Sequence, residues 1–241
     1  MTELLYQIDS YQKDFDAAVV SVDDEYHGVA LDRTAFYPGG GGQPPDHGFL
    51  TWNDSNFNIK RVINIGGNYI HILDGSDPLP PICETVHAKI DWDHRYQLMR
   101  THTAMHILCG VIWRDYGASV TGGNMEPLKG RMDFEFETMR QELVKDIEAT
   151  INQEMNAGRN LIVKILPREE AFQIPDLIRT KINLLPDHIK EVRVVEIEGL
   201  DLQADGGTHV KNTSEVGKIK VADYKSKGKI NKRIYVELES I

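Results

Sequence analysis

The stretch WDHRYQLMRTHTAMHILCGVIWRDYG, residues 92–117, decides the fold of the second half of the chain. It contains no proline, its apolar residues recur at helical spacing from Leu98 to Ile112, and it closes on a glycine. These features predict one long helix. The stretch also holds His102 and His106, and their spacing of four places both imidazoles on one helix face, one turn apart, where they can share a metal ion.

The histidine pair has a plainer interpretation, namely two partly buried histidines with ordinary hydrogen bonds. The residue after the first histidine is Thr103 rather than glutamate. The zinc-protease arrangement HExxH is therefore absent, and so is the general base that it carries.

A second pair of candidate ligands lies about a hundred residues further on, in QADGGTHV, residues 203–210. Asp205 and His209 flank a Gly-Gly turn, which can bring both side chains toward one point. A carboxylate oxygen and an imidazole nitrogen bind zinc at similar distances. The two pairs together predict a His102/His106/Asp205/His209 metal site, and the alternative for the second pair is a polar turn between two strands.

A third candidate segment is RTAFYPGGGGQPPDHG, residues 33–48. Four consecutive glycines let a ligand approach the main chain and expose its N–H groups. No Gly-Lys-Ser/Thr follows, which excludes a P-loop, and Pro44 and Pro45 block the helix that a dinucleotide fingerprint needs. The alternative is an irregular corner of a barrel.

The flanking segments predict an α+β protein. Residues 16–22 and 26–32 are typical of a hairpin, Gly66-Gly67 predicts another, and such short strands favour a small β-barrel. The proline-rich segment 77–85 is expected to link two domains, so we predict a barrel domain over residues 1–85 and a second domain over 86–241.

The second domain combines helices with an antiparallel sheet. A second helix is predicted over residues 138–158, and the segments 131–137, 160–167, 192–200, 218–224 and 232–238 read as strands. Helices followed by several strands favour two layers, with the long histidine-bearing helix against the sheet.

Composition excludes several classes of protein. The 241 residues include 27 Lys/Arg and 37 Asp/Glu, which give a net charge of −10 and argue against general nucleic-acid affinity. No membrane-spanning run or signal peptide is present, and two cysteines make no disulfide framework, so a cytoplasmic protein is expected. Residues 211–241 carry eight basic and four acidic residues, hence +4. This basic C-terminal segment is a candidate for contacts with nucleic-acid phosphates, and the alternative is an edge strand whose lysines are solvated.

The sequence resembles the AlaX family, free-standing relatives of the editing domain of alanyl-tRNA synthetase. The likeness covers nearly the whole chain and rests on FYPGGGGQPPDHG, MRTHTAMHILCGVI, VRVVEIEGLDLQADGGTHVKNTSEVG and KGKINKRIYVEL, in family order. It implies a barrel followed by an editing domain, without an added C-terminal tRNA-binding domain. It also implies a metal-dependent hydrolase that removes serine, and sometimes glycine, from the acceptor end of mischarged tRNA(Ala).

The resemblance assigns roles residue by residue. His102, His106 and His209 match zinc ligands, for one Zn²⁺ per chain. Thr34 and Gln43 match pocket-facing positions, and Thr34 is the candidate contact for the serine hydroxyl. Gln203 is a weaker candidate, for the pocket wall. The residues themselves suggest two further roles: the N–H of Gly41 is a candidate to stabilise an oxyanion, and Lys225, Lys227, Lys229, Lys232 and Arg233 are candidate contacts for tRNA phosphates.

Asp205 departs from the family pattern, which usually has cysteine there. Asp205 either binds the metal directly, as a harder ligand, or misses it and leaves three histidines with an open position. Cys109 is a poor substitute thiolate, since its apolar neighbours favour a core role. Two other functions stay open: a deacylase for a different aminoacyl-tRNA, and a tRNA-binding protein that has lost catalysis through the change at Asp205.

Overall fold

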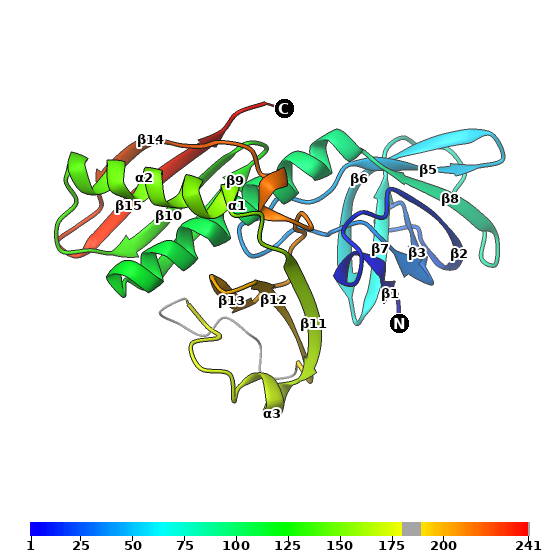
Figure 1. The fold of residues 1–241 in the computed structure, drawn as a ribbon. Coiled ribbons are helices and arrows are strands. Elements are labelled where there is room, and N and C mark those ends of the chain that lie inside the picture. Colours follow the sequence, from blue (N-terminus) through cyan, green and yellow to red (C-terminus); the bar gives the residue numbers. More distant parts are fainter. Residues whose placement is uncertain (180–188, 241) are drawn as a thin grey trace. The chain divides into compact units, whose positions relative to one another are not determined.

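The computed structural model describes residues 1–179 and 189–240 (Figure 1). The chain divides into two compact units. The first comprises residues 1–40 and 44–96, and the second comprises residues 41–43 and 97–241. The tip of the glycine-rich segment therefore belongs to the second unit.

The first unit is a closed barrel of six antiparallel strands. In barrel order the strands are β2 (Asp14–Asp23), β3 (Gly28–Leu31), β7 (Asn68–Leu73), β6 (Ser55–Ile65), β5 (Gly48–Trp52) and β8 (Thr85–Ile90). Alternating side chains of these strands point inward, and Phe15, Leu31, Phe36 and Leu50 are among the residues of the core. The predicted barrel and both predicted hairpins are confirmed.

Short elements complete this unit. The two-residue strands β1 (Glu3–Leu4) and β4 (Arg33–Thr34) pair in parallel, and the 3₁₀ turn η1 (Leu5–Gln7) follows β1. Arg95, in the first turn of helix α1 (Trp92–Tyr116), forms a two-pronged ion pair with Asp46, and both side chains are fully buried. This pair fastens the start of α1 to the barrel.

The proline-rich segment 77–85 does not link two domains, and that prediction is wrong. Strand β8 begins at its last residue and pairs with both β2 and β5, so the segment joins two strands of one barrel. The prolines precede the strand and leave its hydrogen-bonding pattern intact, which is why a composition argument misread them. The barrel thus extends past residue 85.

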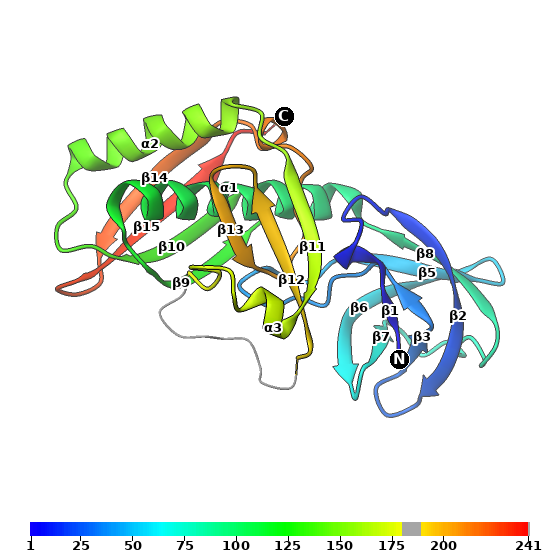
Figure 2. The same cartoon turned by 60° about the horizontal axis from the view of Figure 1, so that its bottom comes forward.

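The second unit packs two helices on a four-stranded antiparallel sheet (Figure 2). The helices are α1 and α2 (Gln141–Asn156), and the strands, in sheet order, are β14 (Ile219–Ser226), β15 (Asn231–Leu238), β10 (Lys129–Glu135) and β9 (Val120–Glu126). The helix α2 buries Val144, Ile147, Ile151 and Met155, which recur every three or four residues. The predicted long helix against an antiparallel sheet is confirmed.

Glycine in the sheet lets α1 approach closely. A Cβ atom at Gly130 would lie 2.8 Å from Sδ of Met105, a distance that real side chains do not tolerate. Met105 follows His102 on α1 and is buried. Met105 therefore packs directly against the main chain of β10, on the side of the sheet that faces the histidine-bearing helix.

A three-stranded sheet forms the rest of the unit. It contains β11 (Leu161–Pro167), β12 (Glu191–Ile197) and β13 (Asp201–Ala204). The short helix α3 (Arg168–Ala171) follows β11 directly, and the 3₁₀ turn η2 (Thr213–Glu215) comes after β13. The sequence did not predict β9 or β13, and β13 is the strand that leads directly into the Asp205 turn. No helix in the described ranges has the length and apolar character needed to cross a membrane.

Candidate metal centre

Helix α1 supplies two imidazoles. His102 and His106 are 6% and 7% exposed, and their ring centroids lie 5.0 Å apart. The helical spacing predicted this geometry, because residues i and i+4 lie one above the other.

The turn after β13 brings the other two candidate ligands to the same place. The N–H of Asp205 donates to the main-chain carbonyl of Arg193 on β12, 3.1 Å away, which holds the start of the turn on the sheet. The N–H of Gly207 donates to Oδ2 of Asp205 at 2.9 Å. His209 then stacks on His102, with ring centroids 4.2 Å apart.

Position 207 requires glycine because neighbouring side chains leave no room for a Cβ atom, and not because of its backbone conformation. A Cβ atom there would lie 2.4 Å from Cε1 of His102 and 2.5 Å from Oε1 of Gln43. The second glycine of the GGT sequence therefore lets the turn close onto the first histidine.

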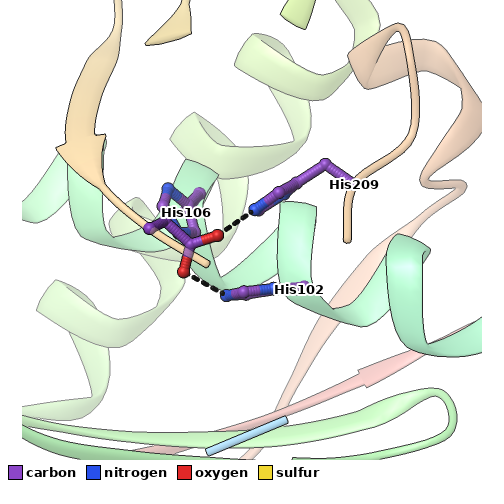
Figure 3. Close-up of side chains that lie close together, drawn as sticks. His102, His106 and His209 are labelled. Carbon is purple, nitrogen blue, oxygen red and sulfur yellow. Dashed lines mark hydrogen bonds and ion pairs between the residues drawn. The ribbon is translucent and has the colours of Figure 1, made fainter. Parts of the chain in front are cut away.

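The three histidines point toward one another (Figure 3), and Asp205 lies among them. One ligand atom from each of His102, His106, Asp205 and His209 lies within 4.8 Å of the other three. Nε2 of His209 is 2.9 Å from Oδ2 of Asp205, and Nε2 of His102 is 3.5 Å from Oδ1. Ligands of a tetrahedral zinc ion lie about 3.3 Å from one another. Three nitrogens and one oxygen gathered in this way could hold a metal ion.

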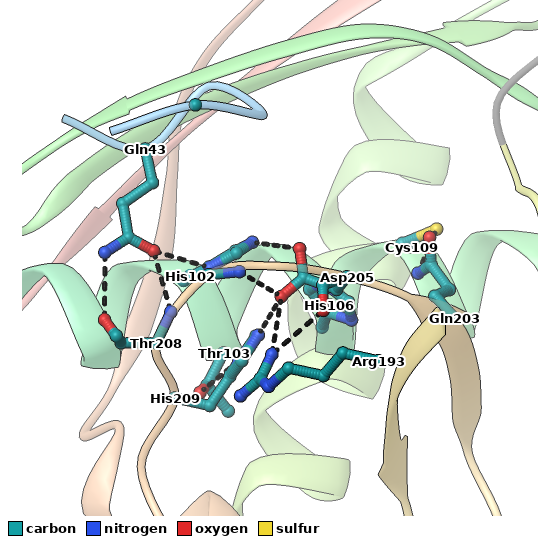
Figure 4. A network of polar contacts seen from close by, with 12 residues as sticks. Gln43, His102, Thr103, His106, Cys109, Arg193, Gln203, Asp205, Thr208 and His209 are labelled. Carbon is teal, nitrogen blue, oxygen red and sulfur yellow. Dashed lines mark hydrogen bonds and ion pairs between the residues drawn. The ribbon is translucent and has the colours of Figure 1, made fainter. Parts of the chain in front are cut away.

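Each histidine is oriented through its other ring nitrogen (Figure 4). Nδ1 of His102 lies 3.0 Å from Oε1 of Gln43, and Nδ1 of His209 lies 3.1 Å from Oγ1 of Thr103. Nδ1 of His106 lies 3.0 Å from Oδ2 of Asp201. Metal-binding histidines generally use one nitrogen for the ion and the other for such a partner.

Protonation also favours cation binding. Burial lowers the pKa of His102 well below its ordinary value, and burial lowers the pKa of His209 to about 4. Burial opposes ionisation of Asp205, but the neighbouring His102 and His209 outweigh it and hold the pKa of this carboxyl well below its ordinary value. Near neutral pH the cluster therefore offers neutral imidazoles at His102 and His209 and a carboxylate at Asp205, the forms that bind metals.

His106 differs from the other two histidines. Burial disfavours its charged form, but the hydrogen bond to Asp201 and the charge of that carboxylate prevail and raise the pKa of His106. Asp201 was not singled out in the sequence. Its one signal is its position, four residues before Asp205, and that signal acquires meaning only once β13 lies against α1.

Gln43, at the tip of the glycine-rich segment, lies beside His102, with its Oε1 3.0 Å from Nδ1 of the imidazole. It is 3% exposed, its Nε2 donates to Oγ1 of Thr208, and its Oε1 accepts from the N–H of Thr208. The neighbouring Gly41 is exposed and has φ = +56°, a left-handed conformation that suits glycine. The roles predicted for Gln43 and Gly41 toward substrate stay predictions.

Two other predicted pocket residues have defined partners. Thr34 is fully buried in the barrel unit, where its hydroxyl lies 2.8 Å from Nε2 of His71. Gln203 lies in the second unit and donates to Oδ2 of Asp201 at 2.7 Å and to Sγ of Cys109 at 3.3 Å. Burial raises the pKa of the Cys109 thiol, which agrees with a core role for this residue.

The predicted phosphate contacts lie on the hairpin of β14 and β15, in two distinct environments. Lys225, Lys227 and Lys229 are exposed, and Lys225 makes a 2.9 Å ion pair with Asp223. Lys232 is instead 6% exposed and its Nζ donates to main-chain carbonyls of the same hairpin.

Arg233 is engaged within the sheet. Its Nε and Nη2 donate to the two oxygens of Asp133 at 2.6 and 2.8 Å. The hydrogen bonds from this guanidinium raise its pKa further above the physiological range. A phosphate at Arg233 would have to share it with that carboxylate.

Comparison with known proteins identifies the family. Residues 192–235 match the "Threonyl and Alanyl tRNA synthetase second additional domain", and residues 5–94 match "tRNA synthetases class II (A)". The chain is 42% identical to "Alanyl-tRNA editing protein AlaX-M" of Saccharolobus solfataricus, over 98% of both chains. The chain belongs to the AlaX family of alanyl-tRNA editing proteins.

Two further relatives extend this likeness. The AlaX-M protein of Methanosarcina barkeri is 38% identical over 99% of both chains. "Alanine--tRNA ligase" of Ignicoccus hospitalis is 36% identical over 91% of this chain, which corresponds to 24% of the ligase. The resemblance to the AlaX family read from the sequence is thus confirmed, and the relation to the synthetase is confined to a quarter of the larger protein.

Proposed function

We propose that this chain is a trans-editing deacylase, which hydrolyses the ester joining a wrong amino acid to tRNA(Ala). Serine is the principal substrate residue and glycine the second. The observation that carries the proposal is the convergence of His102, His106, Asp205 and His209 on one point. The names of the AlaX-M relatives support the same substrate class.

The need for such an activity follows from recognition chemistry. An apolar pocket shaped for alanine rejects serine weakly, because serine merely adds a hydroxyl group. A second site can reverse the test by hydrogen-bonding that hydroxyl. A correctly charged alanyl ester would then leave the polar group of the second site without a partner.

We propose that the four side chains hold one zinc ion, with Asp205 in the position that the family usually gives to cysteine. The observed donor set fits, since the second ring nitrogen of each histidine already has a partner. Bound there, zinc supplies a Lewis acid that polarises an ester carbonyl or lowers the pKa of water.

The remaining steps are proposed for residues of this chain. Water adds to the ester carbonyl carbon, the carbon–oxygen bond to the ribose breaks, and the terminal ribose oxygen leaves with a proton. The N–H of Gly41 is proposed to stabilise the developing oxyanion, and Thr34 to bind the serine hydroxyl. Gln203, already fixed by Asp201, is proposed to form part of the pocket wall.

The exposed lysines of the β14–β15 hairpin, Lys225, Lys227 and Lys229, are proposed to contact phosphates of the tRNA acceptor end. They stand at the basic end of a chain that is otherwise acidic. Such a distribution guides a polyanion to one part of the surface without general nucleic-acid affinity.

The decisive experiment measures release of labelled serine, glycine and alanine from tRNA(Ala) by the zinc-loaded protein and by His106→Ala. We expect fast release of serine by the parent, slow release of alanine, and loss of activity in the variant. His87→Ala is the matched control, since His87 is half exposed on the barrel and pairs with Asp16. Full activity in His106→Ala refutes the metal-dependent mechanism.

Metal analysis separates the alternatives. One zinc per chain together with serine release supports the proposal. Binding of tRNA(Ala) without zinc or hydrolysis would instead identify a binding protein that has lost catalysis. Release of another amino acid from another tRNA would identify a deacylase of different specificity.

A further inference from the structure

The three histidines of the centre differ in the charge of the group behind them. The Nδ1 partners of His102 and His209 are the neutral Gln43 and Thr103, at 3.0 and 3.1 Å. The Nδ1 partner of His106 is the carboxylate of Asp201, at 3.0 Å. A carboxylate behind an imidazole orients the ring and increases its strength as a donor, more than a neutral acceptor does.

Asp201 is itself held in place. Its side chain is fully buried, and the oxygen that faces His106 also accepts a 2.7 Å hydrogen bond from Gln203. Its other oxygen, Oδ1, has no hydrogen-bond partner among the described residues and lies 3.6 Å from Nε of Arg179. Arg179 and Asp201 thus form a buried ion pair, and the desolvation cost of such a pair offsets much of its Coulombic gain, so a purely structural role explains Asp201 poorly.

The backbone of α1 is shaped to admit this carboxylate. Gly110 lies one helical turn after His106, and a Cβ atom there would lie 3.0 Å from Cβ of Asp201 and 3.0 Å from Leu200. Glycine inside a helix costs roughly 1 kcal/mol relative to alanine. Here it lets the first residue of β13 approach the helix beside His106.

We propose that Asp201 is the positioning residue of the metal centre, which sets the affinity for the ion by fixing and strengthening His106. The proposal rests on the metal site of the proposed function. Asp201 does not contact the ion in this scheme, and its effect passes through the imidazole. Gln203 and Arg179 restrain the carboxylate in the orientation that His106 requires.

The test compares zinc dissociation constants of the full-length chain and of Asp201→Asn, measured by competition with a chromogenic chelator. The amide keeps the shape of the side chain and removes its charge. We expect the dissociation constant to rise about 10- to 100-fold, as for other partners of metal-bound histidines. A value within twofold of the parent overturns the proposal.

Glu154→Gln is the matched control. Glu154 is also a buried carboxylate of this unit, 8% exposed, and it pairs with Arg114 and Arg159 rather than with a histidine. Its loss is expected to lower the thermal midpoint of the metal-free protein and to leave zinc affinity unchanged. An equal loss of zinc affinity in both variants would make the effect structural and overturn the positioning role.

A measurement on the unaltered chain covers the case in which Asp201→Asn does not fold. Nitrogen NMR of the zinc-loaded protein, with labelled histidine, reports which ring nitrogen of His106 carries a proton. A proton on Nδ1 is expected, and a proton on Nε2 overturns the proposal. Failure of the parent to bind zinc or to release serine overturns the proposed function too, whereas zinc binding and serine release with unchanged affinity in Asp201→Asn overturn the positioning role alone.

Discussion

Gly207→Ala and Gly206→Ala form a pair that tests the geometry of the centre. The two glycines are adjacent, and neither has the positive φ that would make alanine intrinsically strained. A Cβ atom at Gly206 would meet nothing within 4 Å, whereas one at Gly207 would lie 2.4–2.5 Å from ring atoms of His102 and from the amide oxygen of Gln43. The pair therefore separates the steric effect from the general effect of replacing glycine.

The expected magnitudes differ in sign. Replacing glycine by alanine where the conformation allows it stabilises a protein by about 0.4–1 kcal/mol, through the unfolded state. This gain applies to both variants. At Gly207 the overlap opposes it, because one extra carbon in a filled site costs about 1–3 kcal/mol when the neighbours must shift. The steric term is expected to win at Gly207 and to be absent at Gly206.

Thermal unfolding of the metal-free protein and zinc competition are the two assays. For a chain of this size, 1–3 kcal/mol corresponds to a fall of roughly 2–12 °C in Tm. We also expect Gly207→Ala to weaken zinc binding about 10- to 100-fold, because His102 cannot shift and keep its bond to Gln43. Gly206→Ala should keep the parent Tm or exceed it and keep the parent affinity. Equal behaviour of the two variants would refute the closure of the turn onto His102.

Three further predictions follow from the same centre. Asp205→Cys should raise the ratio of cadmium affinity to manganese affinity in competition titrations, because a thiolate prefers soft ions and a carboxylate prefers hard ones. An unchanged ratio would place Asp205 outside the ligand set. The free energy of unfolding of the metal-free protein, measured with urea, should decrease as pH falls from about 6.5 to about 4. The pKa of His209 is about 4 in the folded chain and higher in the unfolded chain, so unfolding takes up a proton in that pH range. A free energy that does not change with pH would contradict the burial of a neutral imidazole. Replacing Lys225, Lys227 and Lys229 together by alanine should reduce the magnitude of the slope of log tRNA affinity against log salt concentration by up to about 2–3. The control Lys164→Ala removes another exposed lysine and should leave this slope unchanged.

The sequence predicted those parts of the molecule that depend on local pattern. Helical spacing placed His102 and His106 on one face, and a glycine turn placed Asp205 near His209. The residues behind the ligands could not be predicted in this way. Asp201 reaches His106 through the packing of β13 on Gly110, and β13 is a strand of only four residues, two of them polar. Its pairing with β12, and not its own propensity, makes it a strand.

The surroundings of Asp205 explain how a carboxylate can occupy a position at which the resemblance predicts cysteine. A buried carboxylate needs several donors, whereas a thiolate needs few. Oδ2 of Asp205 accepts from the N–H of Gly207 and lies 3.6 Å from Nη1 of Arg193, which also donates to the main-chain carbonyl of Asp205 at 2.9 Å. The buried Arg193 therefore compensates the charge and holds the turn at the same time. Restoring cysteine alone would remove the acid partner of this guanidinium, so the gain in soft-metal preference should come with lower stability of the metal-free chain.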